Sequence, residues 1–266
     1  CGGGGCEDGE VREGTTCVPY VAGDPEPFAG PGIPAGVSWQ WQITGTVDTS
    51  LDVDVYDVDL FELTDAVRDA IHARGSTLVC YFSAGSYEPW TPDAAEFPED
   101  TIGRRLEGWP DERWLDVNDP TVREILEARL DLAVEKGCDG VEPDNVTAWD
   151  TSSGFGVTQL EQLAFNRFLA DAAHVRGLSV ALKNDVEQIA DLLDWFDYTV
   201  NEECWDYDEC DTLAPFVAAD KAVLHTEYVD DFADAQALAD RVCPAGAGFS
   251  TIIKEWDLGP ERLACP

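Results

Sequence analysis

Basic side chains are scarce in this sequence of 266 residues. It contains 16 lysine and arginine residues against 54 aspartate and glutamate residues, which gives a formal net charge of -38. Sequence-independent binding to nucleic acid depends on the release of counterions by lysine and arginine, so this charge excludes nucleic acid as the main partner. The same charge repels anionic lipid surfaces and favours a polycationic partner, although many of these carboxylates could serve solubility alone.

Three further absences narrow the possible functions. No run of about 18 apolar residues occurs, so no segment is expected to span a membrane. The sequence has no Cys-x-x-Cys pair and only three histidines, which disfavours a zinc site. No Gly-x-Gly-x-x-Gly motif follows a predicted strand, which disfavours a Rossmann-type dinucleotide-binding fold. We therefore predict neither a metal nor a cofactor.

Nine cysteines are present, which is an odd number. The first stands before a run of glycines, similar to the mature end of a bacterial lipoprotein, and the alternative is a sequence that merely starts at a cysteine. We expect Cys1 to carry lipid, as the only contact with a membrane, on a protein that is extracellular or at the cell surface. Spacing among the other eight cysteines predicts three disulfides, which pair Cys6 with Cys17, Cys204 with Cys210, and Cys243 with Cys265. Cys80 and Cys138 remain, either as a fourth pair or as buried free thiols.

The distribution of apolar residues predicts a short tail followed by one large domain. Residues 1–35 are rich in glycine, proline and acidic residues, which is typical of a disulfide-pinned tail and linker. Residues 36–266 alternate short apolar runs with amphipathic stretches, two of which end at Gly75 and Gly137. The eight apolar runs that we interpret as strands are Trp39–Ile43, Val53–Asp57, Leu78–Ser83, Gly140–Asp144, Leu178–Lys183, Tyr198–Glu202, Ala222–Glu227 and Phe249–Lys254. Eight such units favour an α/β fold of the (β/α)8 TIM-barrel type, which we expect to be monomeric.

Acidic residues end several of these predicted strands. Barrel enzymes carry out their chemistry at the carboxyl ends of the strands, so these acids are expected to converge on one rim. Alternate residues of a strand share a face, so Glu142 and Asp144 point the same way, and Glu202 faces the rim while Glu203 points away. Two carboxyl groups that face one another across a cleft are the equipment of a glycosidase, and we predict Asp144 and Glu202 as the catalytic pair.

Aromatic and polar residues in or beside the same strand ends suit a sugar ligand, because flat rings stack on sugars and on cationic amines. Some of these aromatic residues could instead pack between the sheet and the helices, and Asn145 and Asp185 could cap helices. The residues that we expect to contact the substrate are Trp39, Trp41, Asp57, Tyr81, Ser83, Glu142, Asn145, Lys183, Asp185, Trp205, Glu227, Tyr228 and Trp256.

Five segments, taken in order, resemble a known family. The segments are Trp39–Gln42, Val79–Glu88, Gly140–Asn145, Leu182–Asp185 and Asn201–Cys204. They look like the glycoside hydrolase family 114 domain, the endo-α-1,4-polygalactosaminidases, which also occurs in spherulin-4-like proteins. The resemblance covers about residues 36–256 and leaves residues 1–35 without a counterpart. It implies a TIM barrel that cuts α-1,4-linked galactosamine polymers with the acids at positions 144 and 202.

Partly deacetylated galactosamine polymers are cationic, so an acidic cleft would attract them. We expect Lys183 to pair with Asp144 or Glu142 and to keep one carboxylate ionised. Glu202, crowded by acids and by Trp205, would then have a raised pKa and act as the general acid. Two alternatives remain: a non-catalytic surface lipoprotein that binds a cationic exopolysaccharide, and a calcium-binding structural protein that uses Asp52, Asp54, Asp57 and Asp59. The second lacks the loop pattern of an EF-hand.

Overall fold

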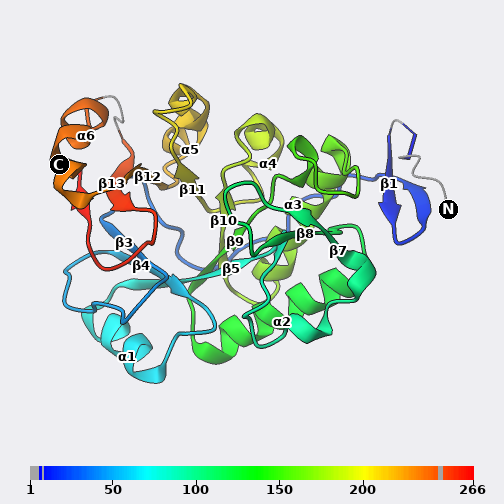
Figure 1. Ribbon diagram of the computed structural model, residues 1–266, viewed down its shortest axis with the longest axis horizontal. Coiled ribbons are helices and arrows are strands. Elements are labelled where there is room, and N and C mark those ends of the chain that lie inside the picture. Colours follow the sequence, from blue (N-terminus) through cyan, green and yellow to red (C-terminus); the bar gives the residue numbers. More distant parts are fainter. Residues whose placement is uncertain (1–5, 8, 245–247) are drawn as a thin grey trace.

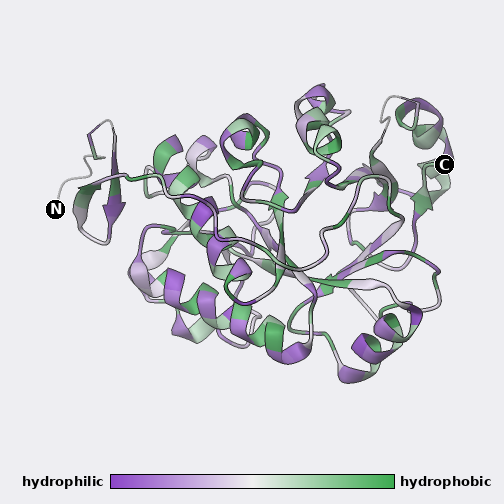
Figure 2. Cartoon of the chain, turned by 180° about the vertical axis from the view of Figure 1, so that it is seen from behind, coloured by the Kyte–Doolittle hydropathy of each residue, from purple (hydrophilic) through white to green (hydrophobic). Residues whose placement is uncertain are grey.

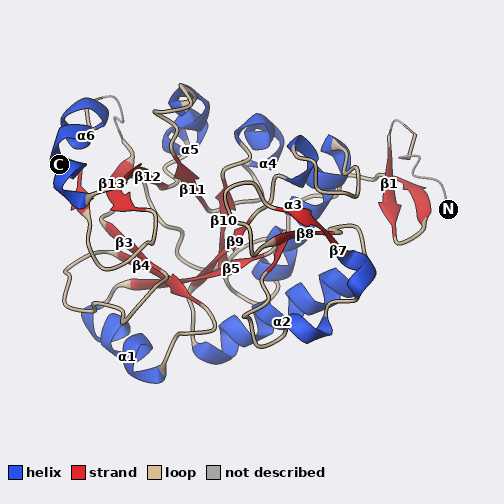
Figure 3. Ribbon diagram, in the orientation of Figure 1, coloured by secondary structure: helices blue, strands red, loops and turns tan. Residues whose placement is uncertain are grey.

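The computed structural model describes residues 6, 7, 9–244 and 248–266, so Cys1 lies outside the described residues. Its centre is a curled nine-stranded sheet surrounded by helices (Figures 1 and 3). Eight strands pair in parallel, and each matches a predicted strand to within two residues. In sheet order they are β3 (Trp39–Gln42), β4 (Val55–Asp59), β5 (Thr77–Ser83), β9 (Gly140–Asp144), β10 (Ser179–Lys183), β11 (Tyr198–Glu202), β12 (Val223–Val229) and β13 (Ser250–Glu255). The short β14 (Leu263–Ala264) adds to β13 in the antiparallel sense.

Helices connect the parallel strands, and capping residues mark where they begin and end. The hydroxyl of Thr64 accepts from the backbone N–H of Val67 at the start of α1, and Gly75 ends that helix with a φ of 81°. The helices are α1 (Asp65–Arg74), α2 (Pro120–Lys136), α3 (Gln159–His174), α4 (Ile189–Leu192), α5 (Ala214–Ala218) and α6 (Ala235–Val242). Short 3-10 turns are η1 (Ala94–Glu96), η2 (Glu99–Thr101), η3 (Ala148–Asp150), η4 (Val186–Gln188), η5 (Cys210–Leu213) and η6 (Phe232–Asp234). Hydrophobic and hydrophilic residues alternate along the longer helices, as an amphipathic surface helix requires (Figure 2).

Buried side chains fall into an outer and an inner layer. The outer layer packs the sheet against α1, α2 and α3. The inner cluster fills the space that the curled sheet encloses, and its strand residues are Trp39, Trp41, Val55, Val79, Ala181, Tyr198, Val200, Leu224 and Ile252. Alternate residues of each strand therefore point into the curled sheet, and the last of them reach its carboxyl-terminal rim.

The first and last parallel strands approach one another across the curled sheet. The indole Nε1 of Trp39 on β3 donates to the carbonyl of Ser250 on β13 at 2.7 Å. The backbone N–H of Ile43, just after β3, donates to the carbonyl of Leu258 beyond β13 at 3.2 Å. These contacts fix the spacing between the two ends of the sheet.

Two small sheets lie outside the predicted elements. Strands β1 (Glu10–Glu13) and β2 (Thr16–Pro19) form a hairpin within the predicted tail, at one end of the molecule (Figure 1). An ion pair of 2.7 Å between Arg12 and Asp116 ties this hairpin to the domain. Strands β6 (Ser86–Tyr87), β7 (Ile102–Arg105) and β8 (Arg113–Leu115) form a second sheet between β5 and α2.

Four disulfides cross-link the described part of the chain. Three are the pairs that the spacing predicts, and the fourth joins Cys80 of β5 to Cys138, which resolves the alternative left open for those two residues. Pairing Cys204 with Cys210 closes a short loop directly after β11. No helix in the described ranges has the length and apolar character needed to cross a membrane.

Candidate active site

A cavity of about 410 Å³ opens at the carboxyl-terminal ends of the parallel strands. Every parallel strand contributes a side chain to its wall, either from its last residues or from the residue that follows. These residues are Trp41, Asp59, Tyr81, Asp144, Lys183, Glu202, Tyr228 and Trp256, in chain order. The convergence arises because parallel strands end on the same edge of the sheet.

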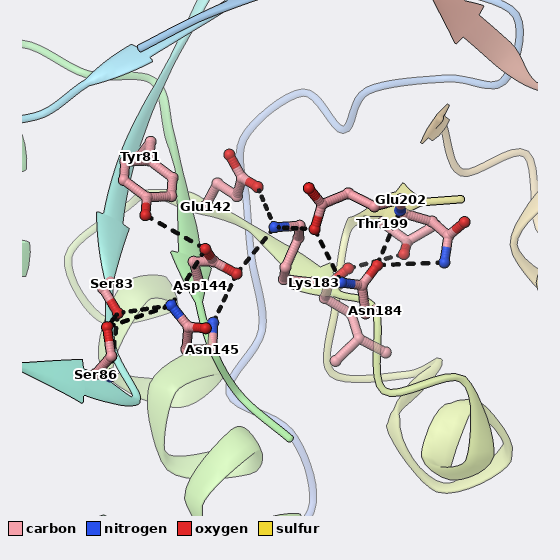
Figure 4. A network of polar contacts seen from close by, with 12 residues as sticks. Tyr81, Ser83, Ser86, Glu142, Asp144, Asn145, Lys183, Asn184, Thr199 and Glu202 are labelled. Atoms are coloured by element: carbon pink, nitrogen blue, oxygen red, sulfur yellow. Dashed lines mark hydrogen bonds and ion pairs between the residues drawn. The ribbon is translucent and has the colours of Figure 1, made fainter. Parts of the chain in front are cut away.

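Lys183 lines the cavity, and its ammonium lies between the carboxyl groups of Asp144 and Glu202 (Figure 4). Its Nζ is 2.9 Å from Asp144 Oδ1, 2.9 Å from Glu202 Oε2 and 3.6 Å from Glu142 Oε1. It also lies 5.0 Å from the centre of the Trp41 ring. Burial alone would lower the pKa of Lys183, but Asp144, Glu202 and Glu142 outweigh burial and raise it well above its usual value. Lys183 is therefore a permanent cation that bridges the two predicted catalytic carboxylates.

Asp144 is held by donors from its own strand end and from β5. The backbone N–H of Asn145 donates to Asp144 Oδ1 at 2.6 Å, and the Tyr81 hydroxyl donates to Oδ2 at 3.3 Å. Asn145 adopts a φ of 62°, and its side-chain amide donates to Ser83 Oγ at 3.0 Å. This turn keeps the carboxylate pointed at Lys183.

Glu202 is held in the same way from the other side of Lys183. The Tyr228 hydroxyl donates to Oε1, and the side-chain amide of Asn184 donates to Oε2 at 3.2 Å. Burial raises the pKa of Glu202, but Lys183 and the hydrogen bonds from Tyr228 and Asn184 outweigh burial and lower it overall. The prediction of a raised pKa for Glu202 is therefore wrong, because it counted the neighbouring acids and missed these donors.

The shared contact with Lys183 limits the separation of the two carboxyl groups. Asp144 Oδ1 and Glu202 Oε2 each lie 2.9 Å from the same nitrogen, so these two oxygens can be no farther apart than twice that distance. These two nearest oxygens are therefore closer to one another than the separation of about 6.5–9.5 Å that the carboxyl groups of inverting glycosidases show.

Two predicted substrate contacts, Asp57 and Glu142, lie beneath the cavity instead of in its wall. Both have no exposed surface. Strand β4 continues to Asp59, two residues beyond its predicted end, so Asp59 reaches the cavity and Asp57 lies one layer deeper. Glu142 lies two residues before the end of β9 and is buried for the same reason. Neither carboxyl can touch a substrate in the cavity.

The other predicted contacts divide between the cavity and its surroundings. Those that line the cavity are Trp41, Tyr81, Asn145, Lys183, Tyr228 and Trp256. Trp39 is buried below the rim. Ser83 is also buried, but it ends β5 beside Asp144, where its Oγ accepts from the Asn145 amide. Asp185 lies in a neighbouring hollow, where Asn166 and Trp149 donate to its carboxylate at 2.7 Å and 3.2 Å. Trp205 and Glu227 line a different hollow beside Tyr228. Glu203 faces these two hollows and not the cavity.

Trp90 and Trp109 line the cavity, and sequence reasoning missed them. They are 60% and 51% exposed and belong to the segment that carries the small sheet of β6, β7 and β8. Across the cavity, Tyr228 and Trp256 stack with ring centres 4.1 Å apart. The signal in the sequence is a pair of tryptophans within the long segment between β5 and α2, a position that the pattern of strand ends does not cover.

The calcium-site alternative has no support among the described residues. Asp54 accepts hydrogen bonds from Ser38, and Asp59 accepts one from the backbone N–H of Glu62 at 2.7 Å. Within the described ranges, the one group with suitably close ligand atoms is Cys204, Cys210 and His225. Its two cysteines form a disulfide, so they are not available as thiolate ligands.

Comparison with known proteins places the chain in a family. The model of Glycoside-hydrolase family GH114 matches residues 21–266. The chain belongs to this family. Membership in GH114 makes it a glycoside hydrolase rather than a non-catalytic binding protein. No curated protein sequence matches this GH114 member significantly.

Two solved structures resemble this GH114 chain over most of its length. The crystal structure of Aspergillus fumigatus Ega3 in complex with galactosamine is 37% identical in sequence, with a TM-score of 0.81, over 92% of this chain and 99% of Ega3. The glycoside hydrolase domain of PelA from Pseudomonas aeruginosa is 16% identical, with a TM-score of 0.68, over 86% of this chain and 99% of that domain. The PelA domain shares the fold with this GH114 chain.

Proposed function

We propose that this GH114 enzyme cuts internal α-1,4 linkages in a cationic, galactosamine-rich polysaccharide, with Asp144 and Glu202 as its catalytic pair. The observation that carries the proposal is the position of these two carboxylates. They come from the carboxyl ends of β9 and β11, face the same cavity, and are both 2.9 Å from Lys183 Nζ. This placement is the one that glycoside hydrolysis on a barrel requires.

The short separation of the two carboxyl groups supports hydrolysis with retention of configuration. In the first step one carboxylate bonds to the anomeric carbon while the bond to the leaving oxygen breaks, and the other carboxyl gives that oxygen its proton. In the second step water replaces the enzyme carboxylate and gives a proton back to the acid. Contacts with Lys183, Tyr228 and Asn184 hold Glu202 as an anion in the free enzyme. The proposal therefore covers the pair and does not divide the acid and nucleophile roles between Asp144 and Glu202.

Charge supports the choice of a cationic substrate. The cavity wall carries the acids Asp59, Glu112, Asp144, Glu202 and Asp257, while its one lysine is already bound to two of them. An acidic cleft on a protein of net charge -38 attracts a polycation over about a Debye length and speeds its encounter. Ega3, which is 37% identical, was crystallised with galactosamine.

Sugar rings would find flat partners on both sides of the cavity. Trp90 and Trp109 stand on one side, and the stacked pair of Tyr228 and Trp256 stands on the other. Exposed tryptophans of this kind stack on sugar faces. We infer that these four side chains hold successive residues of a polymer, which suits an endo-acting enzyme.

We also infer that the curled sheet closes as a (β/α)8 barrel over residues 36–266, and that residues 1–35 are a tail and linker whose last part packs against the barrel, since Ile33 belongs to the inner cluster and the family model begins at residue 21. The hydrogen bond from Trp39 to Ser250 supports closure. We further propose that the active unit is a monomer. Four disulfides support an extracellular location, because disulfides persist in oxidising compartments.

Measurement of new reducing ends released from α-1,4-linked galactosamine polymer tests the proposal. We expect faster release from deacetylated than from fully acetylated polymer, and a sharper difference at low ionic strength. Proton NMR of the first products should show the α anomer before mutarotation. Absence of release from both polymers would refute the substrate, and initial β anomers would refute the retaining mechanism.

A further inference from the structure

The carboxyl groups of Asp57 and Glu142 form a pair inside the curled sheet, directly beneath the catalytic cavity. Both side chains are fully buried and contact one another. Among the described residues, no N–H or O–H donor outside the pair reaches any of their four oxygens. A contact between two buried carboxyl groups is stable only when at least one of them holds a proton.

The ionisable groups around this pair come from every neighbouring strand. From β9 and β10 these are Asp144 and Lys183, and from β5, β11 and β12 they are the phenols of Tyr81, Tyr198 and Tyr228. Lys183 is the one cation among them, and its ammonium is nearer to Asp144 and Glu202 than to Glu142, at 2.9 Å against 3.6 Å. When Asp57 and Glu142 are neutral, the positive charge of Lys183 interacts mainly with Asp144 and Glu202.

We propose that Asp57 and Glu142 are positioning residues for Lys183. While Asp57 and Glu142 are both protonated, the Lys183 ammonium stays between Asp144 and Glu202. Once the buried pair loses a proton to solvent, the ammonium is drawn toward Glu142. This inference rests on the proposed function. Lys183 needs to move little, since Glu142 Oε1 is already 3.6 Å away. The catalytic carboxylates would then lose their shared cation, and their geometry would relax.

The buried pair of Asp57 and Glu142 is expected to lose a proton near neutral pH. Burial raises the pKa of Asp57 to about 7, a rise that the Glu142 hydrogen bond and Lys183 reduce. Burial and then the charge of Asp57 raise the pKa of Glu142 well above its usual value. The kcat/KM of the enzyme should therefore fall as the pH rises past neutrality, because that profile reports the free enzyme.

Two single substitutions should affect this fall differently. Asp57→Asn leaves Glu142 as the one carboxyl group of the pair beneath Lys183, so a fall should persist. Glu142→Gln removes the group that draws Lys183 downward, so the fall should weaken or move about one unit toward alkali. A purely structural role would lower kcat/KM equally at every pH.

Glu88→Gln is the matched control. Glu88 is 6% exposed, and burial followed by the charge of Glu112 raises its pKa to about 8, but no ion pair joins it to Lys183 in the described part of the chain. This variant should keep the wild-type position of the fall in kcat/KM.

The experiment measures kcat/KM on deacetylated polymer from pH 4 to pH 9 for the wild type and the three variants, each first checked for folding by thermal melting. A fall that persists in Asp57→Asn and Glu88→Gln, and that weakens or moves to higher pH in Glu142→Gln, supports the proposal. An unchanged profile in Glu142→Gln, or equal shifts in Asp57→Asn and Glu142→Gln, overturns it while leaving the proposed function intact. If Asp57→Asn does not fold, the profile of Glu142→Gln decides, whereas an inactive wild type would refute the proposed function itself.

Discussion

Replacement of Lys183 by methionine tests how the charges of the site are balanced. The substitution preserves most of the side-chain volume and removes the ammonium that bridges Asp144 and Glu202. Removal of one member of a buried ion pair costs about 3–5 kcal/mol, because the remaining charges lose their partner. For a chain of this size, the loss corresponds to a fall in Tm of roughly 6–15 °C at pH 7.

The cost should depend on pH in a definite direction. Contact with Lys183 helps to lower the pKa of Glu202, so the stability it contributes is present above the ordinary carboxyl pKa and is lost as the pH falls through the folded value. In Lys183→Met the carboxyl groups can take up protons instead. The difference in Tm between wild type and variant should therefore shrink as the pH falls from 7 to 4.

Lys221→Met is the matched control for this experiment. Its Nζ donates to the backbone carbonyls of Leu193 and Phe196 at 2.6 Å and, among the residues that the structure describes, to no carboxylate. The Tm loss of this variant should be the same at both pH values. Differential scanning calorimetry of the three proteins measures each difference, and a Lys183→Met loss that does not change with pH would refute the charge balance described here.

Three further predictions concern other parts of the molecule. Trp90→Ala and Trp109→Ala should each raise KM for long polymer about tenfold and leave KM for a short chromogenic glycoside nearly unchanged, which steady-state kinetics measures. Joint replacement of Cys204 and Cys210 by alanine should cost about 2 kcal/mol in urea unfolding and also lower kcat, since the loop follows Glu202 directly. The wild type should melt several degrees higher at pH 5 than at pH 8: burial raises the pKa of Asp57 and Asp185 to about 7 and of Glu88 to about 8, so the folded state holds more protons across this range.

The sequence predicted the strands and the acidic residues at the cavity rim because both depend on local periodicity. Apolar runs with polar ends located the eight parallel strands to within two residues, and alternation placed Glu202 on the cavity wall and Glu203 outside it. Disulfide spacing predicted three pairs for a similar reason, since each closes a short stretch of chain.

Local periodicity does not predict how far below the cavity rim each inward-facing residue lies. Asp57 and Asp59 share a face of β4, as do Glu142 and Asp144 on β9, so alternation treats them alike. The position of the strand end decides which acid reaches the cavity, and an error of two residues exchanges a cavity residue for a buried one. Trp39 was assigned to the substrate for the same reason, since it lies one layer below Trp41.

The state of Glu202 also depends on contacts that the sequence does not reveal. Its donors Lys183 and Tyr228 come from the neighbouring strands β10 and β12, and register decides that they reach its carboxylate. Trp90 and Trp109 were missed because their segment folds as a separate small sheet with no barrel periodicity. Long-range register and insertions therefore set the part of the site that local patterns could not predict.

The most direct test of the proposed catalytic pair compares Asp144→Asn, Glu202→Gln and Glu203→Gln on deacetylated α-1,4-linked galactosamine polymer. Each change keeps the size of the side chain and removes its charge. We expect kcat to fall at least about 10³-fold in the first two variants and to stay within a few-fold of wild type in the third, because Glu203 lies outside the cavity. Near-normal turnover in Asp144→Asn or Glu202→Gln, in folded protein, would contradict the assignment of the catalytic pair.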